Sequence, residues 1–477
     1  MILSIAWKNI WRNKVRSLIL INTIGFALAG TIFILALMNG WIKDYNIKVI
    51  ETELTHLQIH NPNFAYNFKL KDTISHGSKV LNEIKNLNFT TKVSGRVKVL
   101  GITSSVYATK GAIIIGIDEK KNQEATKVYK YLIDSTSKWL DQTKKQNVII
   151  IGDKLAQDLQ MVRYQITDNS IRKLEEIGLP KNILLKLDSI KNKRFNTSIK
   201  FYLALEKILS KKEFSQYSDI IATFSITYKI GRKIIIRLQD INGNLVEEAF
   251  RIIGVYNTEN DLFDGTTLFV KKSYLTQILN LPPNTINEIV IMVDNNKKVE
   301  EFKQILKEKY PHLLVESMFD LNQIMKMMTN FIWIYYAIFE IFILFALAFG
   351  IVNTMLMAVM ERTKELGMLM AIGMNKKRVF FMIMNESVLL TLSGGILGII
   401  LGYLITLYTG HTGINLSKYA QEGMEALGFS SIIYPHASLI LIIETTILVF
   451  LTGVISAIYP AIKALKLKPA KALRTDI

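Results

Sequence analysis

The chain has 477 residues, half of them apolar, with 58 Lys and Arg against 40 Asp and Glu and a formal net charge of +18. It is too long for one ordinary domain and too apolar for a typical soluble enzyme. The chain contains no cysteine. That excludes disulfides, thiolate zinc sites and thiol redox chemistry.

Four long windows are nearly free of charge, whereas charges are dense everywhere else. The first window is uncharged, and each of the others holds a single glutamate: Glu340, Glu386 and Glu444 in chain order. Each window is at least as long as the roughly 20 residues that a helix needs to cross the hydrocarbon of a bilayer. We therefore predict transmembrane helices at 17–42, 327–360, 379–409 and 432–462.

The first window follows a basic segment at 1–16, as the apolar part of a secretory signal does. Its uncharged run is longer than the usual apolar region of about 7–15 residues. A small-residue cleavage site does not follow Asn39-Gly40-Trp41. We expect a retained anchor, preceded by an amphipathic entry helix at 1–16, with Trp41 at the membrane interface.

Basic residues predict the orientation. The segments 1–16, 361–378 and 463–477 each carry four or five Lys and Arg, whereas the loop 410–431 carries only Lys418. The positive-inside rule places both termini and the 361–378 loop in the cytoplasm. The long segment 43–326 then lies outside. Its surplus of basic residues is on the wrong side of the membrane for nucleic acid, so no nucleic-acid partner is expected.

The segment 43–326 begins with a helical continuation of the first span and then alternates β-branched runs with Gly, Asn and Asp turns. The stretch 171–217 has apolar residues at helical spacing and predicts a helical insertion, with a solvated hairpin favoured over a lipid-binding or partner-binding one. The fold class is a membrane α-helical protein with four transmembrane helices and a large mixed α+β extracytoplasmic domain between helices 1 and 2. The expected strands are 55–60, 93–99, 112–117, 148–151, 233–239, 249–256, 267–270 and 288–293, and the expected helices are 153–159, 272–279 and 298–309.

The loop 361–378 has the pattern of a short amphipathic helix at the membrane surface. Glu361 and Lys364 are spaced as an i,i+3 ion pair, and Gly373 can end the helix in left-handed geometry. An apolar stripe at helical spacing is expected to be exposed and to need a partner: Leu366, Leu369 and Met370. The alternative is a short loop held only by lipid headgroups.

This loop resembles that of ABC transporter permeases in the FtsX/MacB/LolC–LolE superfamily, which share a pattern close to E-R-T-x-E-x-G-x-x-x-A-x-G. The chain matches the pattern at Glu361, Arg362, Thr363, Glu365, Gly367, Ala371 and Gly373. Other stretches resemble the same superfamily: Ala6 to Lys14, Glu386 with Ser393 to Gly398, and Tyr459 to Arg474. The turn at Gly116-Ile117-Asp118 looks most like the lipoprotein-releasing LolC/LolE branch, whereas the loop is more similar to the MacB type.

The resemblance implies an ATP-driven machine in the cytoplasmic (inner) membrane of a bacterium. The 477 residues contain no G-x-x-x-x-G-K-[ST] phosphate loop, so an ABC ATPase subunit is expected in trans. The seven loop residues that match the pattern are expected to couple the chain to this ATPase. The other implied partners are a second permease copy or paralogue, membrane lipid, a lipoprotein or other amphiphilic substrate, and an extracytoplasmic acceptor protein.

The favoured function is the release or translocation of lipoproteins from the outer leaflet. One alternative is MacB-like export of a peptide or small amphiphile. Another is an FtsX-like regulator that moves no substrate and controls a cell-wall hydrolase.

Carboxylates inside spans are costly, at about 2.5–3.5 kcal/mol each on insertion scales, so each needs a reason. Glu386 lies near the cytoplasmic end, and we expect it to pair with a basic flank. Glu340 and Glu444 either line a polar cleft between helices two and four or bind nearby hydroxyls, with candidates at Tyr336, Ser438 and Thr445–Thr446. The glycines of helix three predict close packing: Gly394, Gly395, Gly398 and Gly402. The residues indicate no catalytic, cofactor or metal site.

Overall fold

The structure is a computed structural model that describes residues 7, 10–87, 90–118, 125–133 and 136–466. The chain divides into two compact units. One unit, the helix bundle, comprises Met1–Asp44, Met327–Ile414 and Ile432–Ile477. The other, the mixed unit, comprises Tyr45–Lys326 and Asn415–Ser431. The predicted C-terminal motif beyond residue 466 and part of the predicted entry helix (1–6 and 8–9) lie outside the described residues.

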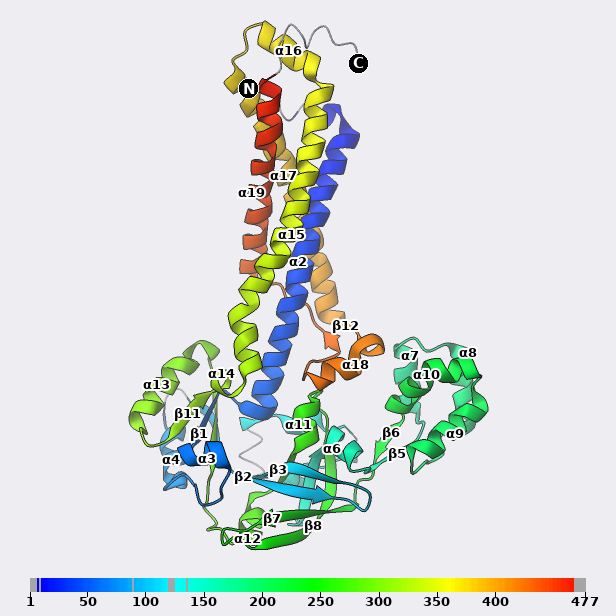
Figure 1. Ribbon diagram of the computed structural model, residues 1–477, viewed down its shortest axis with the longest axis vertical. Helices are drawn as coiled ribbons and strands as arrows, with labels where there is room; N and C mark the ends of the chain where they lie inside the picture. Colours follow the sequence, from blue (N-terminus) through cyan, green and yellow to red (C-terminus); the bar gives the residue numbers. More distant parts are fainter. Residues whose placement is uncertain (1–6, 8–9, 88–89, 119–124, 134–135, 467–477) are drawn as a thin grey trace. The chain divides into compact units, whose positions relative to one another are not determined.

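Four helices in the described residues are long and apolar enough to cross a membrane. They run alongside one another in the bundle (Figure 1): α2 (Lys14–Val49, continued by the π-helical turn η1, Ile50–Leu54), α15 (Gln323–Glu361), α17 (Lys376–Thr412) and α19 (Leu439–Leu465). The last helix begins seven residues after the predicted start at 432. Pro435 disfavours helix in the residue before it, and the Ser438 hydroxyl caps the true start by accepting from the Leu441 N–H.

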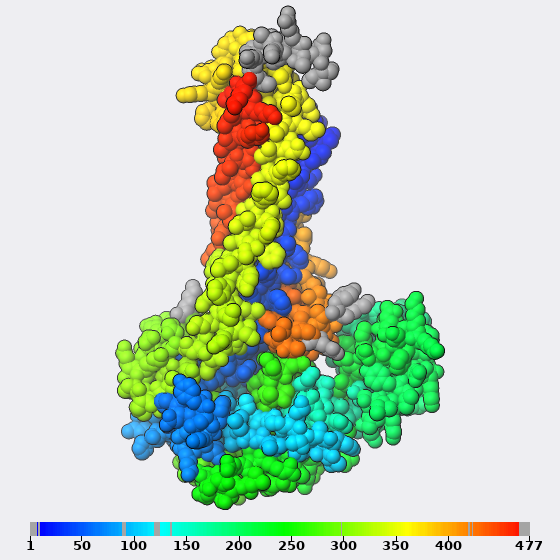
Figure 2. Space-filling model, in the orientation of Figure 1, coloured from blue at the N-terminus to red at the C-terminus, as the bar shows by residue number. Residues whose placement is uncertain are grey.

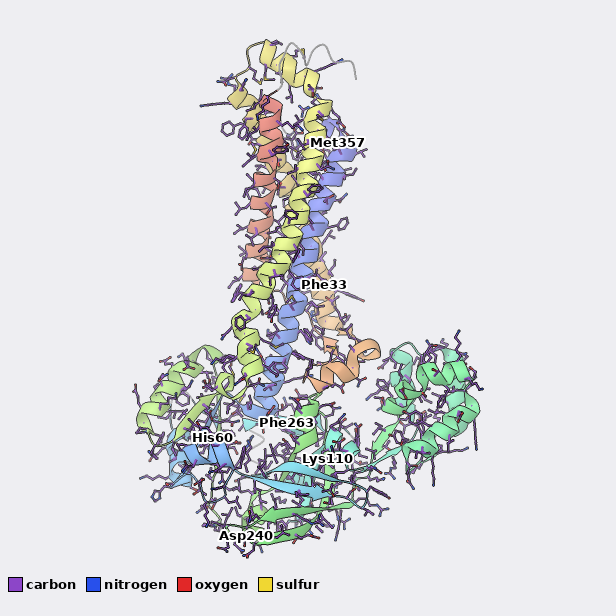
Figure 3. All side chains as sticks on the ribbon, viewed as in Figure 1. Phe33, His60, Lys110, Asp240, Phe263 and Met357 are labelled. Carbon is purple, nitrogen blue, oxygen red and sulfur yellow. The ribbon has the colours of Figure 1, made fainter. Side chains whose placement is uncertain are left out.

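The bundle is apolar both inside and outside. Its core packs leucines and isoleucines of α2 against the other three helices, with Leu20, Ile24, Leu28 and Ile32 all buried. Large apolar side chains also cover its outer surface, and Met357 on α15 is one that projects outward (Figure 3). Such a surface suits hydrocarbon rather than water. The chain is therefore a multi-pass membrane protein with the mixed unit inserted mainly between its first and second spans.

Glycines on one face of α17 allow it to approach α2 closely. A Cβ added at Gly394 would lie 2.7 Å from the Ile24 Cβ, and one added at Gly398 would lie 2.7 Å from the Leu28 Cβ. Gly395 differs, because a Cβ there would meet no atom within 4 Å. A Cβ added at Gly402 would lie 3.1 Å from the Ala29 Cα, so the predicted glycine packing face contains Gly394, Gly398 and Gly402 but not Gly395.

The mixed unit is built on a nine-stranded sheet, and six of its strands pair in a closed cycle because β2 pairs with both β3 and β7. Around the cycle the strands are β2 (Thr90–Ser104), β3 (Thr109–Ile117), β9 (Thr267–Lys271), β4 (Val148–Gly152), β8 (Leu245–Tyr256) and β7 (Lys233–Gln239). The pairs β3–β9 and β4–β8 are parallel, and the others are antiparallel. Alternate residues of these strands form one large core.

Three further strands extend the sheet beyond β2 in the order β10, β1, β11, and all three pairings are antiparallel. Two amphipathic helices, α4 and α13, cover this extension and form a second core with it. The bounds are β1 (Leu57–His60), β10 (Glu288–Val293), β11 (Leu314–Ser317), α4 (Gly77–Lys85) and α13 (Val299–Lys309). The shorter helices of the unit are α3 (Pro62–Asn67), α6 (Asp153–Asp158), α11 (Asp261–Thr266), α12 (Lys272–Ile278), α14 (Met318–Leu321) and α18 (Ser417–Ala426).

The helical insertion is larger than predicted. It occupies 168–224 between the paired strands β5 and β6, and it has four helices rather than a hairpin. Its members are β5 (Val162–Tyr164), α7 (Asp168–Glu176), α8 (Lys181–Leu187), α9 (Ser198–Ile208), α10 (Lys211–Phe224) and β6 (Ile226–Tyr228). The helices share a core of their own, and in Figure 2 they form a distinct lobe of the mixed unit. Ser210 and Glu213 form a capping box that starts α10.

Candidate functional site

The predicted loop helix is α16 (Thr363–Ala371), which lies between α15 and α17. Leu366 and Gly367 are buried, and Leu369 and Met370 are half-buried against the core of the bundle. The expectation that this apolar stripe is exposed for a partner is therefore wrong. The stripe anchors α16 to its own bundle, since helical periodicity identifies an apolar face but not what covers it.

A different face of α16 is exposed. We define the outer face as Lys364, Met368, Ala371 and Ile372, four residues that are all exposed and lie at helical spacing. Ile372 is 79% exposed and Met368 is 50% exposed. The outer face thus presents apolar side chains beside one cationic residue.

The helix ends at a Schellman motif. Gly373 has φ of +100°, and the N–H of Met374 donates to the carbonyl of Leu369 at 2.9 Å. The N–H of Gly373 donates to the carbonyl of Met370 at 3.2 Å. Glycine suits this position because it adopts positive φ at no steric cost.

Ion pairs connect α16 and the end of α15 with residues at and just before the start of α2. Arg12 donates to Glu365 at 2.6 Å, and Arg16 donates to Glu361 at 3.0 Å. Arg362 also donates to Glu365, at 3.2 Å. Burial alone would raise the pKa of Glu365, but the hydrogen bonds from Arg12 and Arg362 outweigh burial and lower it. Glu365 is therefore held as a carboxylate.

Glu386 lies at the centre of the same cluster. Its carboxylate accepts from Arg362 at 3.0 Å and lies 3.7 Å from Arg16. The Glu386 side chain is 4% exposed, and those of Arg362 and Arg16 are 13% and 16% exposed. Here the basic flank supplies the counter-charges, so that one carboxylate connects α2, the start of α16 and α17. We call these residues the ion-pair cluster: Arg12, Arg16, Glu361, Arg362, Glu365 and Glu386.

The remaining motif positions have structural roles or are exposed. The Thr363 hydroxyl donates to the carbonyl of Met360 at 2.6 Å, which ties the start of α16 to the end of α15. Gly367 faces the bundle, and Ala371 belongs to the outer face. Arg12 and Arg16 were not singled out as site residues from the sequence, although their position in a basic flank was visible.

The two other intramembrane glutamates line one cavity of about 290 Å³ between α2, α15 and α19, which we call the acidic cavity. Glu340 projects from α15 and Glu444 from α19. The Thr445 hydroxyl donates to Glu340 at 3.0 Å. Glu340 thus has one of the predicted hydroxyl partners and also lines the cavity together with Glu444.

A separate acidic group lies in the mixed unit. Burial, with the charges of Glu259 and Asp153 nearby, raises the pKa of Glu425 to about 7. Burial, with Asp261 nearby, raises the pKa of Asp153 to about 6. Among the described residues, no group of three or more His, Asp or Glu is arranged to hold a metal ion.

These raised values predict that Glu425 and Asp153 contribute increasingly to the stability of the mixed unit as the pH falls from 8 to about 5.5. A carboxyl whose folded pKa is raised binds its proton more tightly in the folded state than in the unfolded state. Holding the carboxyl ionised therefore destabilises the fold above the folded pKa, and this destabilisation is relieved as the pH falls through the folded pKa. We expect the melting temperature of the unmodified chain, measured relative to that of Glu425→Gln, to rise over this range. Identical pH profiles for the two chains would contradict the assignment.

Part of the chain is similar to known proteins. Residues 337–469 match the family model described as FtsX-like permease C-terminal. The macrolide export ATP-binding/permease protein MacB of Chlorobaculum tepidum is 35% identical over 127 residues, which cover 27% of this chain and 17% of that protein. An uncharacterised ABC transporter permease of Bacillus subtilis, YvrN, is 26% identical over 248 residues, which cover 48% of this chain and 55% of YvrN.

Among solved structures, the extracellular domain of the ABC-type transporter YknZ from Gram-positive bacteria aligns at 10% identity with a TM-score of 0.29. That alignment covers 55% of this chain and 99% of the YknZ domain. The chain spans only about a sixth of the MacB protein and about half of YvrN. The matched family region contains α16, α17, α19 and Glu340. Residues 337–469 are therefore similar to the C-terminal part of FtsX-like permeases, and the chain is similar to ABC transporter permeases of the FtsX and MacB type.

Proposed function

We propose that this chain is the permease subunit of an ATP-driven ABC transporter in a bacterial inner membrane, and that the outer face of α16 contacts an ATPase in trans. The observation that carries the proposal is the attachment of α16. A buried ion pair from Arg362 to Glu386 joins the start of α16 to α17, and Glu386 also lies beside Arg16 of α2. The apolar stripe of α16 packs on the bundle core, while its outer face is exposed.

The ion-pair cluster supports a mechanical role for α16. Interior packing transmits displacement because it has low compressibility, and a buried carboxylate held by two guanidinium groups resists separation. Movement of α16 by an ATPase would then displace α2 and α17 together. The basic residues around α16 and at both ends of the chain support a cytoplasmic position for the outer face.

Lipoproteins or other amphiphiles in the outer leaflet are the proposed cargo. MacB-like export of a peptide or small amphiphile fits the similarity to MacB about equally well. The FtsX-like regulator is less favoured, because the segment 43–326 is larger than the extracytoplasmic domain expected of such a regulator. Purification with associated subunits, followed by mass spectrometry, separates these functions. A bound acylated protein supports lipoprotein release, a bound peptide supports export, and a bound wall hydrolase supports the regulator.

Ile372→Glu is expected to weaken ATPase binding by about tenfold or more, because it places a charge in an apolar contact. The measurement is co-purification of the ATPase and its turnover in membranes. Ile199→Glu on α9 is a matched control, since Ile199 is 71% exposed and Ile372 is 79% exposed. Equal ATPase recovery with Ile372→Glu and with the unmodified chain would contradict the proposed contact.

A further inference from the structure

The acidic cavity holds two carboxylates with no cation in its wall. Among the described residues that line it there is no Lys, Arg or His, and no ion pair to Glu340 or Glu444 is present. The Thr445 hydroxyl reaches one oxygen of Glu340. Carboxylates at membrane depth need a counter-charge or a proton, so this arrangement favours a cationic occupant.

A second observation points to a ligand. Tyr336 also lines the cavity, its side chain is more than nine-tenths buried, and its hydroxyl has no hydrogen-bond partner in the described part of the chain. A buried hydroxyl without a partner is costly unless something else binds it. The Trp333 ring contacts the Tyr336 ring edge-on at a centroid distance of 6.0 Å and also lines the cavity.

Together these groups match a primary ammonium ion. Such an ion has three N–H donors, and the carboxylates of Glu340 and Glu444 with the hydroxyl of Tyr336 provide three sets of acceptor oxygens. Aromatic rings such as those of Trp333 and Tyr336 also attract cations. A quaternary ammonium ion has no N–H donor and would leave these acceptors unpaired.

The size and setting of the cavity favour a lipid as the source of the ammonium group. At about 290 Å³ the cavity is just below the usual size for a drug-like ligand, so it suits a head group rather than a whole amphiphile. Two of its lining residues, Trp333 and Ile440, are 59% and 70% exposed on the apolar surface of the bundle. A ligand entering beside them would come from the bilayer, with its chains remaining in hydrocarbon.

We propose that the acidic cavity binds the primary ammonium head group of a membrane lipid, with Glu340, Glu444 and Tyr336 as its ligands. This proposal rests on the proposed function only in that it requires the bundle to span a membrane. It adds the class of amphiphile that the permease binds, a lipid with a primary ammonium head group.

The test measures lipid binding to the purified full chain by native mass spectrometry, with no ATPase present. The probes are phosphatidylethanolamine, its N-trimethylated analogue phosphatidylcholine, and phosphatidylglycerol, all with the same acyl chains. Phosphatidylethanolamine is expected to bind best, and the double variant Glu340→Gln with Glu444→Gln should bind it about tenfold more weakly. Equal binding of the three lipids, or equal binding by the unmodified chain and the double variant, would overturn the proposal.

Tyr336→Phe keeps the test decisive if the double variant does not fold. It should weaken phosphatidylethanolamine binding, whereas Tyr335→Phe, at an exposed neighbour outside the cavity lining, should not. Equal effects of the two variants would contradict the site. Ethylammonium chloride that binds as tightly as the lipid would overturn the lipid source. Because the lipid-binding test contains no ATPase, a negative result would not bear on the proposed ATPase contact, which its own experiment tests.

Discussion

Glu386→Gln is expected to destabilise the helix bundle by about 3–5 kcal/mol, the usual cost of breaking a buried ion pair. The substitution keeps the size of the side chain but removes the buried counter-charge that Arg362 and Arg16 share. Each arginine then keeps only a half-exposed carboxylate, Glu365 or Glu361. Both arginine side chains are mostly buried, so water replaces the lost interaction poorly. The measurement is the unfolding transition of the purified chain in detergent micelles.

Glu361→Gln is the matched control within the same cluster. The Glu361 side chain is 53% exposed, and its partner Arg16 also lies near Glu386. An exposed ion pair contributes at most about 1 kcal/mol, so this variant should remain close to the unmodified chain. Similar losses of stability for the two variants would show that burial around Glu386 does not determine the strength of the cluster.

Gly398→Ala is expected to cost about 1–3 kcal/mol through overpacking. Its Cβ would lie 2.7 Å from the Leu28 Cβ and 2.8 Å from the carbonyl oxygen of Gly25, so α17 and α2 must move apart. The backbone oxygen cannot rotate away as a flexible side chain can. The same unfolding measurement in micelles checks this result.

Gly395→Ala controls for the change in helix propensity. It lies three residues away on the same helix, and its Cβ would meet no atom within 4 Å. Alanine favours a helix over glycine, so this variant is expected to be neutral or slightly stabilising. Equal destabilisation by the two alanine variants would contradict the close approach of α17 to α2.

The features that were predictable from sequence depend on local patterns. The four spans were predictable because long windows of the sequence lack charged residues. Strands such as β7 and β10 were predicted at their observed bounds, because β-branched runs lie between turn residues. The strands β5 and β6 have three residues each, which is too short for a periodic signal. The extent of the helical insertion was also missed, although the capping box at Ser210 is visible in the sequence.

The candidate sites depend on contacts between distant residues. Glu386 was expected to have a basic partner, but Arg16 lies on a different helix and 370 positions earlier, and no local pattern links the two. The stripe through Leu366 was identified, yet its spacing could not show that the bundle itself covers it. Glu340 and Glu444 share one cavity because α15 and α19 pack together with α2, which is a property of the fold.

Thiol cross-linking at α16 tests the central claim most directly. The chain contains no cysteine, so Met368→Cys introduces its only thiol, at a position that is 50% exposed. A thiol-directed photo-cross-linker at Met368→Cys is expected to join the chain to its ATPase in native membranes. The same reagent at Ile199→Cys should give no such product. Efficient labelling of Met368→Cys without any ATPase adduct would contradict the role of the α16 outer face.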